Sequence, residues 1–96
     1  MPKGYFCAEI HVVDQESYEG YRQRVGATIE AFGGRLLVRG GDPRVLEGSE
    51  PTGRAAVSEF DSPERAMAWY NSPEYQAVLP MRLDNTTSRA LLATGL

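Results

Sequence analysis

The sequence predicts an α+β fold in which a four-stranded antiparallel sheet carries helices on one face. Several short segments alternate apolar and polar residues, which is typical of strands that bury one face. Longer segments repeat apolar residues at steps of three and four, as amphipathic helices do. Along the chain the order is strand, helix, strand, and then strand, helices, strand. One right-handed crossover in each half brings the four strands into a single sheet.

The first half opens with a strand predicted over residues 5–13. Asp14 follows it as the expected helix N-cap, and Glu16 lies where a negative charge favours the first turn. The helix carries one apolar stripe, formed by Tyr18, Tyr21, Val25, Ile29 and Phe32. The two glycines at 33–34 end it, because glycine adopts the left-handed conformation that closes a helix.

A second strand is predicted over residues 35–39 and a third over residues 54–60. Strict alternation in the second strand places its side chains on two opposite faces. Leu36 and Val38 share one face, and the other carries Arg35, Leu37 and Arg39. Between the two strands, residues 45–47 predict a short extension or hairpin arm. Residues 48–53 have the glycine, proline and serine content of a loop.

Two copies of the tripeptide Ser-Pro-Glu follow, at 62–64 and at 72–74. Each places a capping hydroxyl before a proline at the first helical position. They predict helices over 63–70 and 73–83, the second bent by Pro80, and a last strand over 88–94. The complete order is that of the ferredoxin-like βαββαβ plait.

The helices of such a plait cover one face of the sheet only. The residues expected on the other, open face are neither plainly polar nor plainly apolar: Tyr5, Cys7, Glu9, Leu37, Arg39, Ala55, Val57 and Glu59. Packing against a second copy would bury this face, and a small chain gains most from such burial. We therefore expect a homodimer whose sheets pack face to face.

Composition limits the remaining possibilities. A chain of 96 residues fits one domain, expected over 1–96, and a hydrophobic content of 42% excludes a disordered tail. The net charge of −3, with acidic and basic residues interspersed, predicts neither a nucleic-acid nor a membrane partner. No signal peptide is visible and Cys7 is the single cysteine, so we expect a cytoplasmic protein.

Four segments resemble a known family, the domain of unknown function 1330: residues 33–41, 45–48, 59–60 and 69–76. The opening residues 3–5 and the turn at 14–18 also resemble sequences of this family, so the resemblance covers nearly the whole chain. It implies the dimeric α+β barrel superfamily, in which two plaits pack sheet against sheet. That superfamily includes cofactor-independent monooxygenases, lactone isomerases, haem-binding branches and transcriptional effector domains. The resemblance thus implies a fold and a dimer and leaves the activity open.

Arg39, Glu9 and Glu59 are expected to converge on the open face. They form either an anion site in which one carboxylate acts as a base, or an ion-pair network that fixes the dimer register. His11, the single histidine, is either a base or a polar strand residue. A metal site is not expected, because one cysteine and one histidine cannot supply the ligands of a zinc site.

A cleft is expected between the helices and the sheet, because the helical segment after the third strand is broken. Tyr18, Tyr21, Tyr75 and Arg82 would line it and orient a small polar or aromatic acid, unless the aromatic residues simply form core.

Two functions follow from these residues. The first is an enzyme without a cofactor that acts by proton transfer, as an isomerase does, or by oxygenation. Its substrate would be a small organic acid or ketone, with arginines orienting the anion and Glu59 or His11 accepting a proton. The alternative is a non-catalytic metabolite-binding or accessory module. A titratable group beside an arginine in the cleft favours catalysis.

Overall fold

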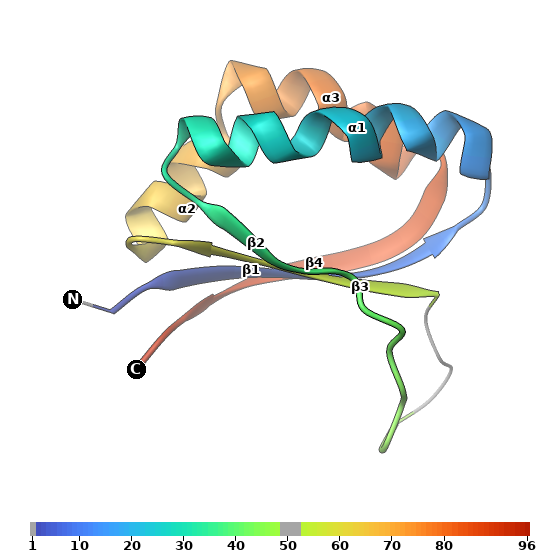
Figure 1. Cartoon of the computed structure of the whole chain (residues 1–96), viewed down its shortest axis with the longest axis horizontal. Coiled ribbons are helices and arrows are strands. Elements are labelled where there is room, and N and C mark those ends of the chain that lie inside the picture. The colour runs from blue at the N-terminus through green and yellow to red at the C-terminus, as the bar shows by residue number, and fades with distance from the viewer. Residues whose placement is uncertain (1, 49–52) are drawn as a thin grey trace.

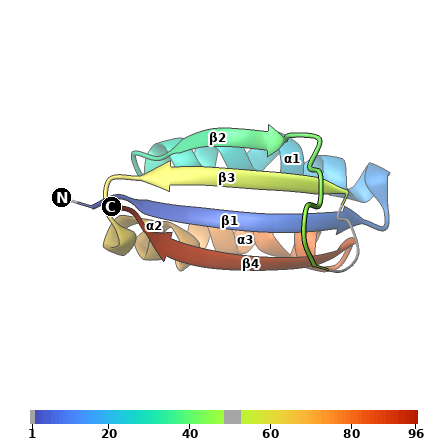
Figure 2. The same ribbon diagram turned by 90° about the horizontal axis from the view of Figure 1, so that it is seen from below.

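All helices of the described residues, 2–48 and 53–96, lie on one face of a four-stranded sheet (Figure 1). In this computed structural model the elements are β1 Gly4–Val12, α1 Gln15–Ala31, β2 Arg35–Gly40, β3 Arg54–Phe60, α2 Pro63–Tyr70, α3 Pro73–Leu83 and β4 Thr86–Thr94. The sheet order is β2-β3-β1-β4, and each neighbouring pair is antiparallel (Figure 2). The predicted plait, with helices on one face, is confirmed.

The predicted helix starts are confirmed by their hydrogen bonds. The Asp14 carboxylate accepts from the backbone N–H of Ser17 at 3.2 Å, and Ser62 and Ser72 cap α2 and α3 in the same way. Gly33 ends α1 with a φ of 75°, which a side chain rarely tolerates. Both predicted helix ranges after the third strand match the structure, and α3 continues through Pro80.

The hydrophobic core fills the space between the helices and the sheet. Its largest member, Trp69, is fully buried, with its ring centroid 5.0 Å from that of Phe6 and 4.1 Å from that of Tyr75. The apolar stripe of α1 contributes four buried side chains: Tyr18, Tyr21, Val25 and Ile29. The predicted core stripe is therefore correct, and Phe32 packs against its end.

A β-bulge in β2 changes which side chains face the helices. Leu36 pairs with Ser58 and Arg39 pairs with Ala56, so three steps in β2 match two in β3. Ser58 and Ala56 both face the helices, because they pair with the helix-facing residues of β1. The extra residue reverses the alternation from Val38 onward. The prediction that Arg39 lies on the open face is wrong for this reason.

The loop between β2 and β3 also differs from expectation. Residues 45–47 form no strand within the described segment 41–48, so the predicted hairpin arm is wrong there, and 49–52 of the predicted loop lie outside the described residues. The described part leaves the sheet on the side away from the helices, and its Leu46 is 85% exposed (Figure 1). The last strand begins two residues earlier than predicted, at Thr86.

Candidate functional site

A cleft opens between α1 and the β2–β3–β1 part of the sheet. Its inner wall is apolar, formed by Phe6, Ala8, Ile10, Val25, Ile29, Leu36 and Trp69 among others. The cavity volume is about 40 Å³, and the empty space counted together with the open solvent at the mouth is about 530 Å³. Ligand sites of proteins combine such an apolar wall with a few polar groups that fix orientation.

Three arginines of the cleft lie nearest to solvent. Arg39 is exposed and Arg22 and Arg54 are half-buried, whereas most of the other lining residues are buried. The Arg39 guanidinium passes close to Gly26 of α1, where a Cβ would lie 3.6 Å from it. The Arg54 guanidinium lies 5.9 Å from the centre of the Tyr18 ring. The mouth therefore carries three guanidinium groups, of which that of Arg22 is paired with Glu19, and the interior is apolar.

Arg22 adds a buried donor to this mouth. Its Nη1 donates to the Glu19 carboxylate at 3.2 Å, which holds the side chain against α1. Its Nε is buried and has no hydrogen-bond partner within the described part of the chain. A buried donor without a partner is costly, and an acceptor entering the cleft would relieve that cost.

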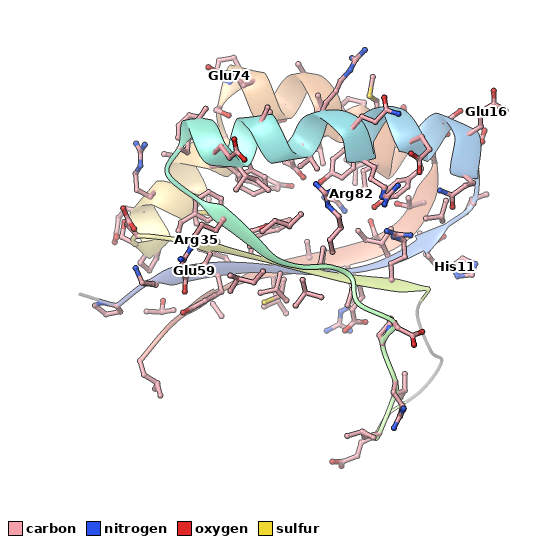
Figure 3. The ribbon with its side chains drawn as sticks, in the orientation of Figure 1. His11, Glu16, Arg35, Glu59, Glu74 and Arg82 are labelled. Atoms are coloured by element: carbon pink, nitrogen blue, oxygen red, sulfur yellow. The ribbon has the colours of Figure 1, made fainter. Side chains whose placement is uncertain are left out.

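A chain of buried polar groups lies behind the cleft and connects α1, α3 and β4. The hydroxyls of Tyr21 and Tyr75 are 3.0 Å apart, and Arg82 Nη2 donates to the Tyr75 hydroxyl at 3.5 Å. Arg82 Nη1 donates to Ser88 Oγ at 2.7 Å. Tyr75 is fully buried and Arg82 is 2% exposed. Figure 3 shows Arg82 in the space between the helix layer and the sheet.

The charge states of this buried chain follow from its surroundings. Burial, and then the Tyr75 hydroxyl, raises the pKa of Tyr21, so Tyr21 keeps its proton near neutral pH. Burial by itself lowers the pKa of Arg82, but the two tyrosine hydroxyls raise it by more. Arg82 is therefore a buried cation, and in the described structure its hydrogen bonds go to hydroxyls and to no carboxylate.

The structure divides the predicted site residues between two faces. Tyr18, Tyr21 and Arg39 line the cleft, while Tyr75 and Arg82 lie directly behind Tyr21 and do not line it. A cleft between helices and sheet exists, but it lies under α1 and not at the break between α2 and α3, so the prediction that Tyr75 and Arg82 line it is wrong. Arg39 reaches it only because of the bulge.

The two predicted proton acceptors lie away from this cleft. Glu59 belongs to the open face, where it binds Arg35 and accepts from the Tyr5 hydroxyl at 2.8 Å. The hydrogen bond from Arg35, and then the one from Tyr5, lowers the pKa of Glu59 and makes its carboxylate a weak base. His11 is exposed near the end of β1, far from Glu59 (Figure 3).

The expected convergence of Arg39 with Glu9 and Glu59 is therefore wrong. Arg35 takes the place that was predicted for Arg39, because Arg35 is the residue paired with Glu59 across β2 and β3. Strand alternation had already placed Arg35 on the open face. The pairing register, which alternation does not supply, decides which arginine meets the carboxylate.

Two further arginines of the cleft were not predicted, Arg22 and Arg54. Arg22 directly follows Tyr21 and lies four residues after Tyr18, so helical spacing places it beside the apolar stripe. That spacing is the signal that would have found it. Arg54 opens β3 opposite Ile10, a position that becomes visible only with the strand pairing.

The described residues can be compared with the requirements of a metal cluster and of a membrane-spanning helix. Among them, no group of three or more histidine, cysteine, aspartate or glutamate side chains is arranged to hold a metal ion. Within the same residues, none of the helices combines the length and the apolar character needed to cross a bilayer.

A family model described as "Domain of unknown function (DUF1330)" matches residues 3–96. Among curated proteins, no sequence matches this chain.

Solved structures share the fold at low sequence identity. A protein of unknown function from Rhodopseudomonas palustris is 18% identical, with a TM-score of 0.81 over 99% of this chain and 83% of that one. A dimeric ferredoxin-like protein of unknown function from Thermobifida fusca is 13% identical, with a TM-score of 0.67 over 99% and 92%. SnoaB, a cofactor-independent oxygenase from Streptomyces nogalater, is 14% identical, with a TM-score of 0.69 over 100% and 95%. At these identities the likeness establishes the fold alone.

Proposed function

This chain belongs to the DUF1330 family, and we propose that its helix-side cleft binds a small organic anion with an apolar body. The proposal is supported by the arrangement of charge: the guanidinium groups of Arg22 and Arg39, with that of Arg54 near them, line an otherwise apolar cleft. Guanidinium groups bind carboxylates through paired, charge-assisted hydrogen bonds. The apolar wall then accommodates an aryl or branched alkyl group.

Binding is better supported than proton transfer. Among the described residues that line the cleft, none is a carboxylate or a histidine. Tyr18 and Tyr21 are the remaining acidic side chains of that lining, and burial keeps Tyr21 protonated. A general base is most often a histidine or a carboxylate, and the described lining of the cleft contains neither. We therefore assign recognition of the anion to these residues, and no proton transfer.

Thermal unfolding with matched ligands tests this proposal. Hydrocinnamate and phenylbutyrate carry a carboxylate and an aryl group, and hydrocinnamide is the uncharged counterpart of the first. Each acid is expected to raise Tm by about 5 °C at about ten times its Kd, and the amide is expected to have no effect. Binding without discrimination between acid and amide, or no binding of either acid, would contradict the proposal.

Substitution locates the binding. Arg39→Gln is expected to weaken binding of both acids about tenfold, because a charge-assisted hydrogen bond at the mouth is lost. Arg24→Gln is the matched control, since Arg24 is an exposed arginine of α1 that does not line the cleft. If the two substitutions weaken binding equally, the acids do not bind in this cleft.

We further propose that a second copy of the chain covers the open face. Leu91, Cys7, Val57 and Val38 are paired in register, so an apolar row crosses the whole sheet there. Leu91 is 49% exposed in the single chain. Similar proteins from Thermobifida fusca and Bacteroides fragilis are described as dimeric. A face of this kind is what an isologous dimer buries.

Sedimentation at micromolar concentration tests the dimer. Twice the chain mass is expected for the natural sequence, and Leu91→Lys is expected to shift it towards one chain mass. Leu83→Lys serves as the control, because Leu83 is similarly exposed at 53% but lies at the end of α3, on the helix side. A monomer for the natural sequence would overturn this second proposal.

A further inference from the structure

The buried pair Tyr21 and Tyr75 shares one hydrogen bond whose direction can be settled. The oxygen atoms are 3.0 Å apart, and geometry alone allows either hydroxyl to donate. Tyr75 is fully buried and does not line the cleft, whereas Tyr21 does line it. Buried hydroxyl protons need an acceptor, and the acceptor within reach of Tyr75 in the described structure is the Tyr21 oxygen.

Arg82 reinforces this direction. A guanidinium group only donates hydrogen bonds, so the Tyr75 oxygen accepts from Arg82 Nη2 at 3.5 Å. Because the Tyr75 oxygen accepts from Arg82, the Tyr75 hydroxyl proton is directed to the Tyr21 oxygen and donates a hydrogen bond to it. The resulting order runs from Arg82 to Tyr75 to Tyr21, and each donor polarises the next group in the chain.

The proton of the Tyr21 hydroxyl is left for the cleft. Its oxygen already accepts from Tyr75, and no other acceptor for its proton is found among the described residues. The Arg82 guanidinium also lies 5.8 Å from the centre of the Tyr21 ring, which favours one orientation of that side chain. Because Tyr21 lines the cleft, its hydroxyl proton is the one in this chain of hydrogen bonds that a ligand in the cleft can accept.

We infer that the ligand is an oxo acid: its carboxylate lies at the arginines of the mouth, and a carbonyl or enolate oxygen accepts the Tyr21 hydrogen bond. This rests on the proposed anion binding and adds a second point of recognition to it. Tyr75 and Arg82 are positioning residues, since they act on the ligand through Tyr21. A group that only donates, such as an ammonium, is disfavoured at this position.

Matched acids separate the two points of recognition. Phenylpyruvate differs from hydrocinnamate, and benzoylpropionate from phenylbutyrate, by one carbonyl in place of a methylene. The two pairs place that carbonyl at different distances from the carboxylate. At least one oxo acid is expected to bind about tenfold more tightly than its partner, as measured by calorimetric titration.

Two conservative variants test whether the hydroxyls of Tyr21 and Tyr75 cause the preference for the oxo acid. Tyr21→Phe is expected to abolish the preference for the oxo acid and to leave the affinity for its carbonyl-free partner nearly unchanged. Tyr75→Phe is expected to reduce the preference in the same way, because the Tyr21 proton is then no longer directed into the cleft. A purely structural role of either tyrosine would weaken both acids of a pair equally. Thermal unfolding without ligand confirms that each variant is folded.

The outcomes distinguish the two proposals. If carbonyl-free acids bind and neither oxo acid is preferred, the oxo-acid inference is overturned and anion binding stands. A preference that survives in Tyr21→Phe overturns the inference as well. If none of the four acids binds, anion binding and the inference fall together.

Discussion

Two clusters of arginine and tyrosine lie on opposite faces of the same sheet, and they differ in one component. On the open face, Arg35 and the Tyr5 hydroxyl both bind the carboxylate of Glu59. On the helix side, Arg82 meets the hydroxyl of Tyr75, which in turn contacts that of Tyr21. Figure 3 shows Arg35 and Glu59 together at one end of the sheet and Arg82 between the two layers.

The difference assigns a role to each face. Glu59 neutralises the open-face cluster within the chain, so that cluster needs no further partner. The helix-side cation, Arg82, is more deeply buried, and within the described residues its hydrogen bonds go to the hydroxyls of Tyr75 and Ser88. The cleft reaches this cluster at Tyr21, whose hydroxyl contacts that of Tyr75. This difference supports the two proposals, that the ligand binds on the helix side and that a second subunit covers the open face.

The largest expected effect compares one tyrosine from each cluster. Tyr75→Ala removes a fully buried ring that contacts Trp69 and Tyr70, and is expected to lower the free energy of unfolding by about 3–5 kcal/mol. Tyr5→Ala is expected to cost clearly less, because its ring is only partly buried. Urea denaturation measures both, and similar losses would mean that the two clusters contribute equally to the core.

A smaller effect is expected from the acceptor of Arg82. Ser88→Ala removes the oxygen that accepts from Arg82 Nη1 at 2.7 Å and leaves a buried charged donor without that partner. The expected loss is about 1–3 kcal/mol. Thr87→Ala is the control, since Thr87 is an exposed neighbour in the same strand. If the two variants unfold at the same urea concentration, Arg82 does not depend on this bond.

The two clusters are also expected to differ in their response to acid. The folded-state pKa of Glu59 lies below its usual value of 4.5. Its contribution to stability is therefore complete above that value and is lost as the pH falls through the folded-state pKa. Glu59→Gln should reduce the loss of stability on acidification, while Tyr75→Phe should leave its pH dependence unchanged. Parallel acid profiles for Glu59→Gln and the natural sequence would show that this carboxylate is not stabilised by folding.

The smallest effect is expected at the exposed edge of the open face. Lys3 and Asp61 form an ion pair at 3.7 Å, with side chains that are 44% and 80% exposed. Such a pair contributes little, so Lys3→Met should change the free energy of unfolding by less than about 0.5 kcal/mol. A larger change would indicate that Lys3 contributes to the Glu59 cluster.

Local signals in the sequence predicted most of the fold. Asp14, Ser62 and Ser72 determine helix starts through contacts three residues away, so their roles can be inferred without the tertiary structure. The α1 stripe likewise placed Tyr18 and Tyr21 on the side of the cleft.

The rest of the site depends on register, which local patterns do not contain. A single inserted residue in β2 moves Arg39 from the open face to the helix side. The same register pairs Arg35 with Glu59, so the Glu59 carboxylate lies on the open face and not in the cleft. Periodicity predicts which residues share a face of a regular strand, but a bulge arises from the packing of one strand on its neighbour.

Nuclear magnetic resonance titration with benzoylpropionate locates the ligand on one face of the sheet, because it reports on both faces at once. We expect the side-chain Nε signals of Arg22, Arg39 and Arg54 to shift, together with backbone signals of α1 around Tyr21. Signals of the open-face hollow lined by Cys7, Glu9 and Arg89 should stay unchanged. Shifts confined to that hollow, with the signals of α1 unmoved, would contradict the placement of ligand binding on the helix side.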